Sequence, residues 1–311
     1  MLKFVCRPSG PRSAPQLLGA IIAGTALLVS SSVASAATIA WAIDSSQSSI
    51  TLDVPDQSVS LGGTTATIRL RDAGNNNNWT QGRTAAVAGT LVTDYVDGVS
   101  IEFLGGQHNA FGLVSGNFRP NPAAFDPNST NSSNPNGQYT NTTTAPAVYA
   151  ARVRASVSIL TVDAGFVSFL DVDYDIMSAP LALDGSGNFA GNALTMGVAD
   201  ALIAFDGLSV ALIGQPIPDQ PPTPLGAPVL GSNTAAGASV TAPDPVGDPL
   251  LRKLTIPVNV PLQLDLQGAL VNASATGQIV AYAYLTAPEP GTVVLLAFGL
   301  GGLAIVGRKR A

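Results

Sequence analysis

Polar and apolar residues alternate along several segments of this chain, and a two-residue period places successive side chains on opposite faces of an extended strand. Within 65–71, Ala66, Ile68 and Leu70 separate threonine and arginine residues. A half-buried strand requires this pattern, because one face lies on the core and the other in water. The sequence predicts strands at 49–54, 65–71, 100–104, 148–162, 166–176, 254–266 and 270–284.

Short turn signals separate these segments, which favours strands joined as antiparallel hairpins. Asp, Asn, Gly, Thr and Ser dominate the region, and helix-forming residues other than alanine are scarce. The sequence therefore predicts one all-β domain over 37–286, an antiparallel β-sandwich or β-barrel. The turn signals are Asp97-Gly98, Asp163-Ala164-Gly165 and Asp184-Gly185.

Two prolines interrupt the predicted strand at 254–266. Neither Pro257 nor Pro261 carries an N–H group, so this strand is expected at an edge or with a bulge. The chain from 251 to 284 offers only two strands, and two strands alone do not usually hold a core in water. We therefore expect 251–284 to return and pair with the N-terminal sheet.

Two segments rich in Pro, Asn, Gly and Thr interrupt the alternation, at 120–146 and 215–249. Proline cannot donate to a strand ladder, and Asn, Gly and Ser favour turns. We interpret both segments as long surface loops. One further segment, 190–204, suits a short helix through its apolar residues between Met196 and Leu202.

The first 36 residues have the three parts of a secretory signal peptide. Basic residues at 3, 7 and 12 precede an apolar stretch at 17–29, and Ala34-Ser35-Ala36 provides an A-x-A cleavage site. The alternative, a permanent membrane helix, needs about 20 apolar residues. We predict cleavage after Ala36, which removes Cys6, the only cysteine, and leaves a domain without thiols or disulfides.

The C-terminal end combines three short features in a fixed order. Pro288-Glu289-Pro290 precedes an apolar run at 291–307, which ends at Arg308-Lys309-Arg310. As a transmembrane helix this run would extend about 26 Å at about 1.5 Å per residue, close to the thickness of a hydrocarbon core. The basic residues favour the cytoplasmic side, so Pro288-Glu289-Pro290 is expected on the outer face of the membrane, within reach of a protease.

This ordered set at 287–311 resembles the PEP-CTERM sorting domain. The resemblance implies passage through the secretion translocon, a transient anchor in the inner membrane, and recognition by an exosortase. An exosortase is a membrane-embedded protease-transpeptidase. The expected result is removal of the helix and delivery of the domain to the cell surface or the extracellular matrix.

A second resemblance lies at the start of the predicted domain. The segment from Trp41 to Ile50 is similar to the opening of periplasmic lipocalin-like barrels that bind polyisoprenoid lipids. Gln47 stands where those barrels have a histidine. The resemblance supports a barrel rather than a particular ligand.

The charge balance of the domain limits its partners. Between the two ends, eight Lys and Arg residues stand against nineteen Asp and Glu residues, a formal charge of −11. Nucleic acids and anionic lipids carry the same sign and are therefore poor partners.

Catalytic chemistry has few residues to use. His108 is the only histidine, so sites with several imidazoles are excluded, and Glu102 is the only glutamate before the C-terminal motif. No nucleophile elbow, phosphate loop or dinucleotide motif occurs. His108 follows Gly105-Gly106, and we expect it in a turn. The sequence therefore favours a protein that is not an enzyme.

Three aspartates alternate with apolar residues at 171–175. A strand places Asp171, Asp173 and Asp175 on one face, where their charges repel one another. A bound Ca²⁺ would compensate them, since it prefers carboxylate oxygens, and Arg152 and Arg154 are alternative partners. The simpler interpretation is a solvated polar face. The segment 184–188 also has the composition of a calcium loop, and we interpret it as a plain turn.

The favoured hypothesis is a non-enzymatic surface or extracellular-matrix protein of a Gram-negative-type bacterium, in contact with extracellular polysaccharide. The alternative is a binding module. It would be either a lipocalin-like barrel with an apolar ligand or a lectin-like sandwich that uses Ca²⁺ at Asp171, Asp173 and Asp175. No other cofactor is expected.

Overall fold

The computed structural model describes residues 36–61, 64–72, 78–157, 160–207, 218–242, 247–266 and 269–285. Their paired strands are all antiparallel, which confirms the predicted all-β class. Two 3-10 turns also occur, η1 (Pro122–Ala124) and η2 (Gly191–Ala193). The strands are β1 (Ala37–Ile43), β2 (Ser49–Asp53), β3 (Gln57–Leu61), β4 (Thr64–Arg71), β5 (Thr84–Val96), β6 (Ser100–Phe103), β7 (Asn109–Gly112), β8 (Gly116–Phe118), β9 (Phe125–Asp126), β10 (Gln138–Tyr139), β11 (Ala145–Ala147), β12 (Tyr149–Val157), β13 (Leu160–Met177), β14 (Leu181–Ala182), β15 (Asn188–Phe189), β16 (Thr195–Gly207), β17 (Gln220–Pro224), β18 (Val229–Ser232), β19 (Ala238–Thr241), β20 (Leu251–Leu266) and β21 (Ala269–Tyr284).

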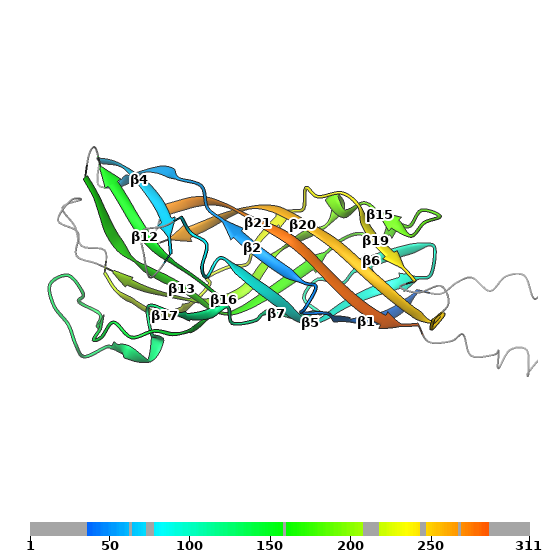
Figure 1. Cartoon of the computed structure of the whole chain (residues 1–311), viewed down its shortest axis with the longest axis horizontal. Helices are drawn as coiled ribbons and strands as arrows, with labels where there is room; N and C mark the ends of the chain where they lie inside the picture. The colour runs from blue at the N-terminus through cyan, green and yellow to red at the C-terminus, as the bar shows by residue number, and fades with distance from the viewer. Residues whose placement is uncertain are drawn as a thin grey trace, which may run out of the picture. The chain divides into compact units, whose positions relative to one another are not determined.

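One large sheet contains 17 of these strands (Figure 1). Its main path runs from β16 through β13 and β7 to β5, then through β1 and β2 to β21, β20 and β19. The strands β1 and β2 follow one another between β5 and β21, and each pairs with both. A branch leaves β13 through β12 and β4 to β3. The long strand β13 therefore pairs with β12 in its first half and with β7 further on.

Two carboxamide side chains connect strands that no ladder joins in the described part of the chain. Gln57 on β3 donates from Nε2 to the Asn272 carbonyl at 2.6 Å and accepts the Asn272 N–H at 2.7 Å. Asn233, which follows β18, donates to the Pro257 carbonyl at 2.9 Å and accepts the Asn259 N–H at 2.8 Å. Each amide replaces a peptide unit. These bonds hold β3 beside β21 and the end of β18 beside β20, on the two outer sides of the β20–β21 hairpin.

Apolar side chains from these strands meet in one core. Trp41 and Tyr149 are fully buried, and each has a polar partner: Trp41 donates to Thr93 and Tyr149 to the Ile50 carbonyl. Two cavities in this core have volumes of about 20 Å³ each, the space of one water molecule. The segment that resembles lipocalin-like barrels thus contributes a tryptophan that fills the core.

The predicted strands at 49–54, 65–71, 100–104, 166–176, 254–266 and 270–284 are confirmed, with small shifts at their ends. The turns at 97–98 and 184–185 are confirmed as well. The single strand at 148–162 is wrong, because β12 and β13 form a hairpin there. The turn at 163–165 is also wrong, since this segment is a bulge inside β13. Bulges and turns both favour small residues, and the sequence signal does not separate them.

We expected the prolines of β20 at an edge or in a bulge, and they lie at an edge. The strand pairs with β21 along its whole length without a register shift, so there is no bulge. On its other side β19 pairs only with residues 253–255. Pro257 lies beyond them, where Asn233 binds its carbonyl. The return of 251–284 to the N-terminal sheet is confirmed, because β21 pairs with both β1 and β2.

The helix expected at 190–204 is wrong. Residues 195–207 form β16, which pairs with β13, β17 and β18, and only η2 is helical. A side chain at Gly197 would meet the Val229 carbonyl at 2.1 Å, so this position requires glycine for the close approach of β18. Pairing with three strands overrides a weak helical spacing of apolar residues.

The expected loop at 215–249 is wrong for much of its length, because β17, β18 and β19 lie within it. β17 contains Pro221, Pro222 and Pro224 and occupies the free edge of β16, where missing N–H groups are tolerated. The segment 120–146 does lie mostly outside the large sheet. It contains η1 and a separate two-stranded sheet of β9 and β10.

Both chain ends fall largely outside the described residues. Ala36 is exposed, and β1 begins at Ala37, directly after the predicted cleavage site. Among the residues that the structure describes, no helix is long and apolar enough to cross a membrane. The predicted residues that lie outside are Ala34, Pro288, Glu289, Pro290, Arg308, Lys309 and Arg310.

Candidate functional site

Asp171, Asp173 and Asp175 lie on β13 and alternate with buried apolar neighbours. This places the three carboxylates on the outer face of the sheet, as the sequence predicts. Asp171 has a φ of 47°, a left-handed conformation that costs a non-glycine residue about 1 kcal/mol or more. The strain lies in a bulge where β13 exchanges β12 for β7 as its neighbour.

The three carboxylates do not converge. Asp175 accepts the Gly106 N–H at 3.0 Å, whereas Asp173 lies opposite Asp200 on β16. Burial, together with the charges of Asp200 and Asp171, raises the pKa of Asp173. Within the described ranges, no group of three or more His, Cys, Asp or Glu residues is close enough to hold a metal ion. The calcium hypothesis therefore stays a prediction without a preformed ligand set.

Arg152 and Arg154 do not pair with this row, contrary to one of the expectations. Both form ion pairs with Asp163, and Arg154 Nε lies 3.1 Å from Asp163 Oδ1. The β13 bulge brings Asp163 opposite Arg154. A regular strand would have turned Asp163 to the other face, so the alternation in the sequence did not indicate this pairing.

A groove of about 490 Å³ lies beside the strained bulge. Phe111, Val114 and Leu170 contribute apolar surface to it, and Asp171 and Asp173 contribute carboxylates. Apolar lining with a few polar acceptors is the usual composition of a small-ligand site. The groove makes this part of β13 the candidate for binding a ligand from solution.

His108, which we expected in a turn, follows the turn at 105–106 and has a structural environment. Its side chain is 1% exposed. Nδ1 accepts the Val92 N–H at 2.8 Å, and Nε2 lies 2.5 Å from the Ile176 carbonyl. A carbonyl only accepts, so Nε2 carries the proton and the ring is the neutral Nε2–H tautomer. Neither nitrogen is available as a general base.

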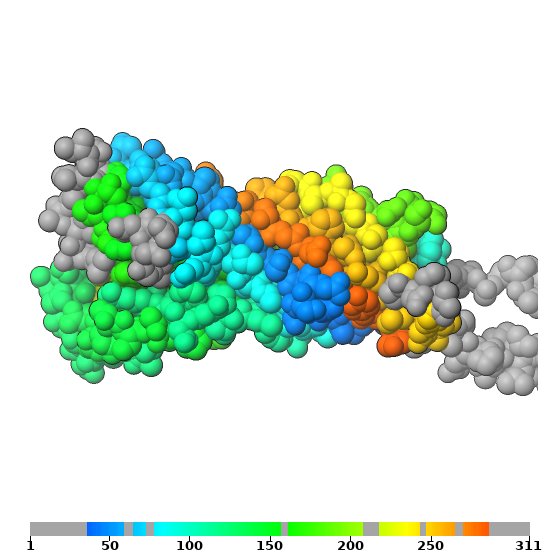
Figure 2. Space-filling model, viewed as in Figure 1, coloured from blue at the N-terminus to red at the C-terminus, as the bar shows by residue number. Residues whose placement is uncertain are grey.

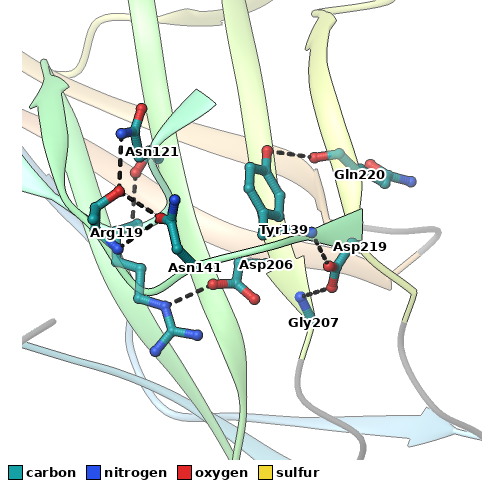
Figure 3. A network of polar contacts seen from close by, with 10 residues as sticks. Arg119, Asn121, Tyr139, Asn141, Asp206, Gly207, Asp219 and Gln220 are labelled. Atoms are coloured by element: carbon teal, nitrogen blue, oxygen red, sulfur yellow. Dashed lines mark hydrogen bonds and ion pairs between the residues drawn. The ribbon is translucent and has the colours of Figure 1, made fainter. Parts of the chain in front are cut away.

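A polar network anchors the start of the segment 120–146 to the end of β16 (Figure 3). Arg119 donates from Nε to Asp206 Oδ2 at 2.6 Å. The guanidinium also lies 4.4 Å from the centre of the Phe166 ring, within the range of a cation–π interaction. The Arg119 carbonyl accepts the hydroxyl of buried Ser168 at 3.1 Å. This end of the segment is therefore fixed by three contacts.

Asp219 fixes the same segment from the other side (Figure 3). Its carboxylate accepts the Tyr139 N–H at 2.7 Å and the Gly207 N–H at 2.8 Å. Its own N–H donates to Asn134 Oδ1 at 2.8 Å, and the Tyr139 hydroxyl donates to the Gln220 carbonyl at 2.9 Å. Asp219 thus connects the segment to the end of β16.

Burial raises the pKa of both Asp206 and Asp219, although Arg119 opposes this shift at each. Raised carboxyl pKa values are common in acid–base catalysis. Here Asp206 is held by a guanidinium and Asp219 by two backbone N–H groups, so the pair acts as a clamp on the chain. The four positions 119, 139, 206 and 219 are far apart in the sequence, and no local motif links them.

The segment 184–188 is a turn, as predicted. Asp184 Oδ1 accepts the N–H groups of Ser186 and Asn188, both at 2.8 Å, and Oδ2 accepts the Asn188 side chain at 2.9 Å. These hydrogen bonds lower the pKa of Asp184, and the one from the Asn188 side chain contributes most. Gly187 has a φ of 81°, and a side chain there would meet the Val240 carbonyl at 2.0 Å. The Asp184 carboxylate closes the turn.

Comparison with protein families decides what the C-terminal end is. Residues 286–311 match the family model described as the PEP-CTERM protein-sorting motif. The chain carries a PEP-CTERM sorting signal. No curated protein and no solved structure matches the chain. The PEP-CTERM motif is a signal for export to the cell surface or the extracellular space, and it implies processing by an exosortase, which is a membrane protein.

The PEP-CTERM motif follows the β-domain without overlap. The last strand, β21, ends at Tyr284, and Leu285 still donates its N–H to the Leu250 carbonyl at 2.9 Å. The motif begins at residue 286. All strand pairs and core residues that the structure describes therefore lie before the sorting signal.

Proposed function

We propose that this chain is an exported surface or extracellular-matrix protein of a Gram-negative-type bacterium, with a non-enzymatic role. The observation that carries the proposal is the direct succession of a complete β-domain and a PEP-CTERM motif at Leu285 and residue 286. Exosortase processing then removes the tail without breaking a strand. The signal peptide, the transmembrane sorting helix and cleavage next to Pro288-Glu289-Pro290 belong to this proposal.

The state of the acid–base groups supports the non-enzymatic role. Both ring nitrogens of His108 hold backbone groups of β5 and β13. Asp206 is paired with Arg119, and Asp219 holds two backbone N–H groups. A general base needs a lone pair that the substrate can reach. The unprotonated nitrogen of His108 already accepts a bond inside the fold, and Asp206 and Asp219 are only 4% and 7% exposed.

The test is the location of the protein in the producing cell. Deletion of 288–311, or alanine at Pro288, Glu289 and Pro290 together, should prevent processing by the exosortase. The deletion should leave soluble protein in the periplasm or the medium, and the alanine variant should accumulate in the inner membrane with its tail intact. Fractionation and immunoblotting of both variants measure these outcomes.

A matched control removes a proline elsewhere. Pro127→Ala changes an exposed proline of the segment 120–146 and should be sorted like the wild type. Surface attachment that is unchanged by deletion of 288–311 would contradict the proposal.

A binding module is the second candidate, and the groove beside Asp171 and Asp173 favours it. The groove lies on the outside of the sheet, whereas the two core cavities have room for one water each. The calcium version predicts a rise in Tm with millimolar CaCl₂ that is lost when Asp171, Asp173 and Asp175 are all changed to Asn. If CaCl₂ does not raise the Tm of the wild type, the calcium version is wrong.

A further inference from the structure

Four arginines form a square on the outer face of the neighbouring strands β4 and β12. Arg69 lies directly opposite Arg154, and Arg71 lies directly opposite Arg152. Residues next to them on both strands, such as Ile68 and Val153, are buried in the core, so the arginines lie on the outer face, where their side chains are 20–35% exposed. We call these four residues the arginine square. Figure 2 shows the surfaces of the two strands side by side.

Like charges directly opposite each other destabilise a strand pair. Two carboxylates compensate part of this repulsion. Asp56 lies 2.6 Å from Arg69 and 3.7 Å from Arg71. Asp163 pairs with both arginines of β12, as described above. Among the side chains that the structure describes, four guanidinium groups thus face two carboxylates.

The bulge in β13 is what places Asp163 in the square. Val153 pairs with Gly165 and Arg154 with Asp163, so Ala164 is the extra residue. Without it, Asp163 would lie opposite Ala155, on the side of the core. A side chain at Gly165 would meet the Phe205 ring at 2.5 Å and the Asp206 carbonyl at 2.7 Å, so glycine is required there. The local backbone is therefore shaped around this charge arrangement.

The surroundings of the square are hydrogen-bonding groups. Arg69 Nη1 donates to the Ser156 hydroxyl at 3.0 Å, and Ser156 lies 2.8 Å from the Thr161 hydroxyl. Thr67, opposite Ser156, lies on the same outer face. The planar guanidinium group binds carboxylates through two parallel hydrogen bonds, and hydroxyl groups bind other hydroxyls. This combination suits a polymer that carries both carboxylates and hydroxyls.

The position of the square favours an extracellular partner. Asp56 is adjacent to Gln57, which binds Asn272 on β21. Tyr284, where the tail begins, is twelve residues further along that strand. At about 3.3 Å per residue, Asn272 lies about 40 Å from Tyr284 along β21. The strands β4 and β12, which carry the square, lie towards the opposite end of the sheet from the C-terminal end of β21 (Figure 1).

We propose that the arginine square binds an acidic polysaccharide through its carboxylate groups. The proposal goes beyond the sorting function, and it concerns the folded domain alone. Four of the eight Lys and Arg residues between the chain ends lie in this square, while the region as a whole has a formal charge of −11. Duplex nucleic acids and anionic membranes bring a denser negative charge against the acidic remainder of the surface. A flexible acidic glycan contacts the square alone.

The experiment measures binding of polygalacturonate to the purified full chain in detergent, at low and at moderate salt, with uncharged dextran for comparison. The wild type should bind polygalacturonate but not dextran, and salt should weaken the binding. Arg69→Gln with Arg154→Gln should weaken it about tenfold or more, because two guanidinium–carboxylate contacts are lost. Arg69→Lys with Arg154→Lys keeps the charge but not the planar fork, and should give an intermediate loss.

Arg252→Gln with Lys253→Gln is the matched control. It also removes two positive charges, but from the start of β20, which pairs with the last residues of β21. It should bind like the wild type, and circular dichroism should show all variants folded. The proposal is overturned if the wild type does not bind polygalacturonate, or if the control weakens binding as much as the square variant. Tighter binding to duplex DNA or to phosphatidylglycerol vesicles would reject the polysaccharide as the partner. Each result is independent of how the tail is sorted.

Discussion

His108 joins two strands through its ring, because Val92 donates to one nitrogen and Ile176 accepts from the other. His108→Ala leaves both backbone groups without a partner in a buried site. We expect the free energy of unfolding to fall by about 2–4 kcal/mol, from the unpaired groups and the cavity together. Urea denaturation measures this change. The exposed neighbour is the control, and a loss no larger than that of Gln107→Ala would contradict the structural role.

Asp173 has a raised pKa, because burial and the charges of Asp200 and Asp171 disfavour its ionised form. A carboxyl group of this kind weakens the fold above its folded-state pKa, and the penalty disappears as the pH falls through that value. Asp173→Asn should therefore raise the free energy of unfolding at pH 7 by a few tenths of a kcal/mol. The gain should vanish below pH 3.8, the ordinary value. Lower stability of the variant at pH 7 would refute this explanation.

Single residues were predictable from the sequence where the backbone is regular. The alternation at 171–175 correctly places the three aspartates on the outer face. Asp163, by contrast, was assigned to a turn, whereas it lies beside an extra residue in a bulge of β13, which decides the face that its side chain occupies. The turn role of His108 was incomplete, since its partners lie on strands that are distant in the sequence.

At the scale of the elements, the side chains of Asn233 and Gln57 connect neighbouring strands to the β20–β21 hairpin and differ in burial. Their contributions to the free energy of unfolding should therefore differ. Asn233 is 2% exposed, whereas the contacts of Gln57 are at the surface. Asn233→Asp removes the donor to the Pro257 carbonyl and buries a charge, so it should cost about 2–4 kcal/mol. Gln57→Glu should cost about 1 kcal/mol or less. Denaturation midpoints of the two variants measure these losses. A loss for Gln57→Glu that equals or exceeds the loss for Asn233→Asp would contradict the structure.

Strands were predicted well where polar and apolar residues alternate. They were predicted poorly where the segment contains proline or where pairing with distant strands determines the structure. β17, β18 and β19 were missed because proline and glycine resemble a loop, although an edge strand accepts Pro221 and Pro222. β16 resembled a helix because its pairing with β13 is not visible in local composition. The missing N–H of Pro257, by contrast, correctly indicated an edge as one of two alternatives, and the regular register of β20 excludes the other, a bulge.

At the scale of the whole molecule, the fold should not depend on the sorting signal. A chain that ends at Leu285 keeps every strand that the structure describes, so its Tm should agree with that of the full chain within about 2 °C. A chain that ends at Leu250 lacks β20 and β21, to which β1, β2 and β19 pair, and should not fold. Thermal unfolding followed by circular dichroism distinguishes the two. A large loss of stability on removal of 286–311 would show that the domain extends into the motif.

The central claim is that a complete β-domain is released from a PEP-CTERM tail by processing at the membrane. Intact-mass spectrometry of the protein recovered from the surface or the medium of the producing bacterium tests it most directly. We predict a chain that begins at Ala37 and lacks the apolar run and the Arg308-Lys309-Arg310 cluster. A recovered protein whose mass still includes residues 291–311 would contradict the claim.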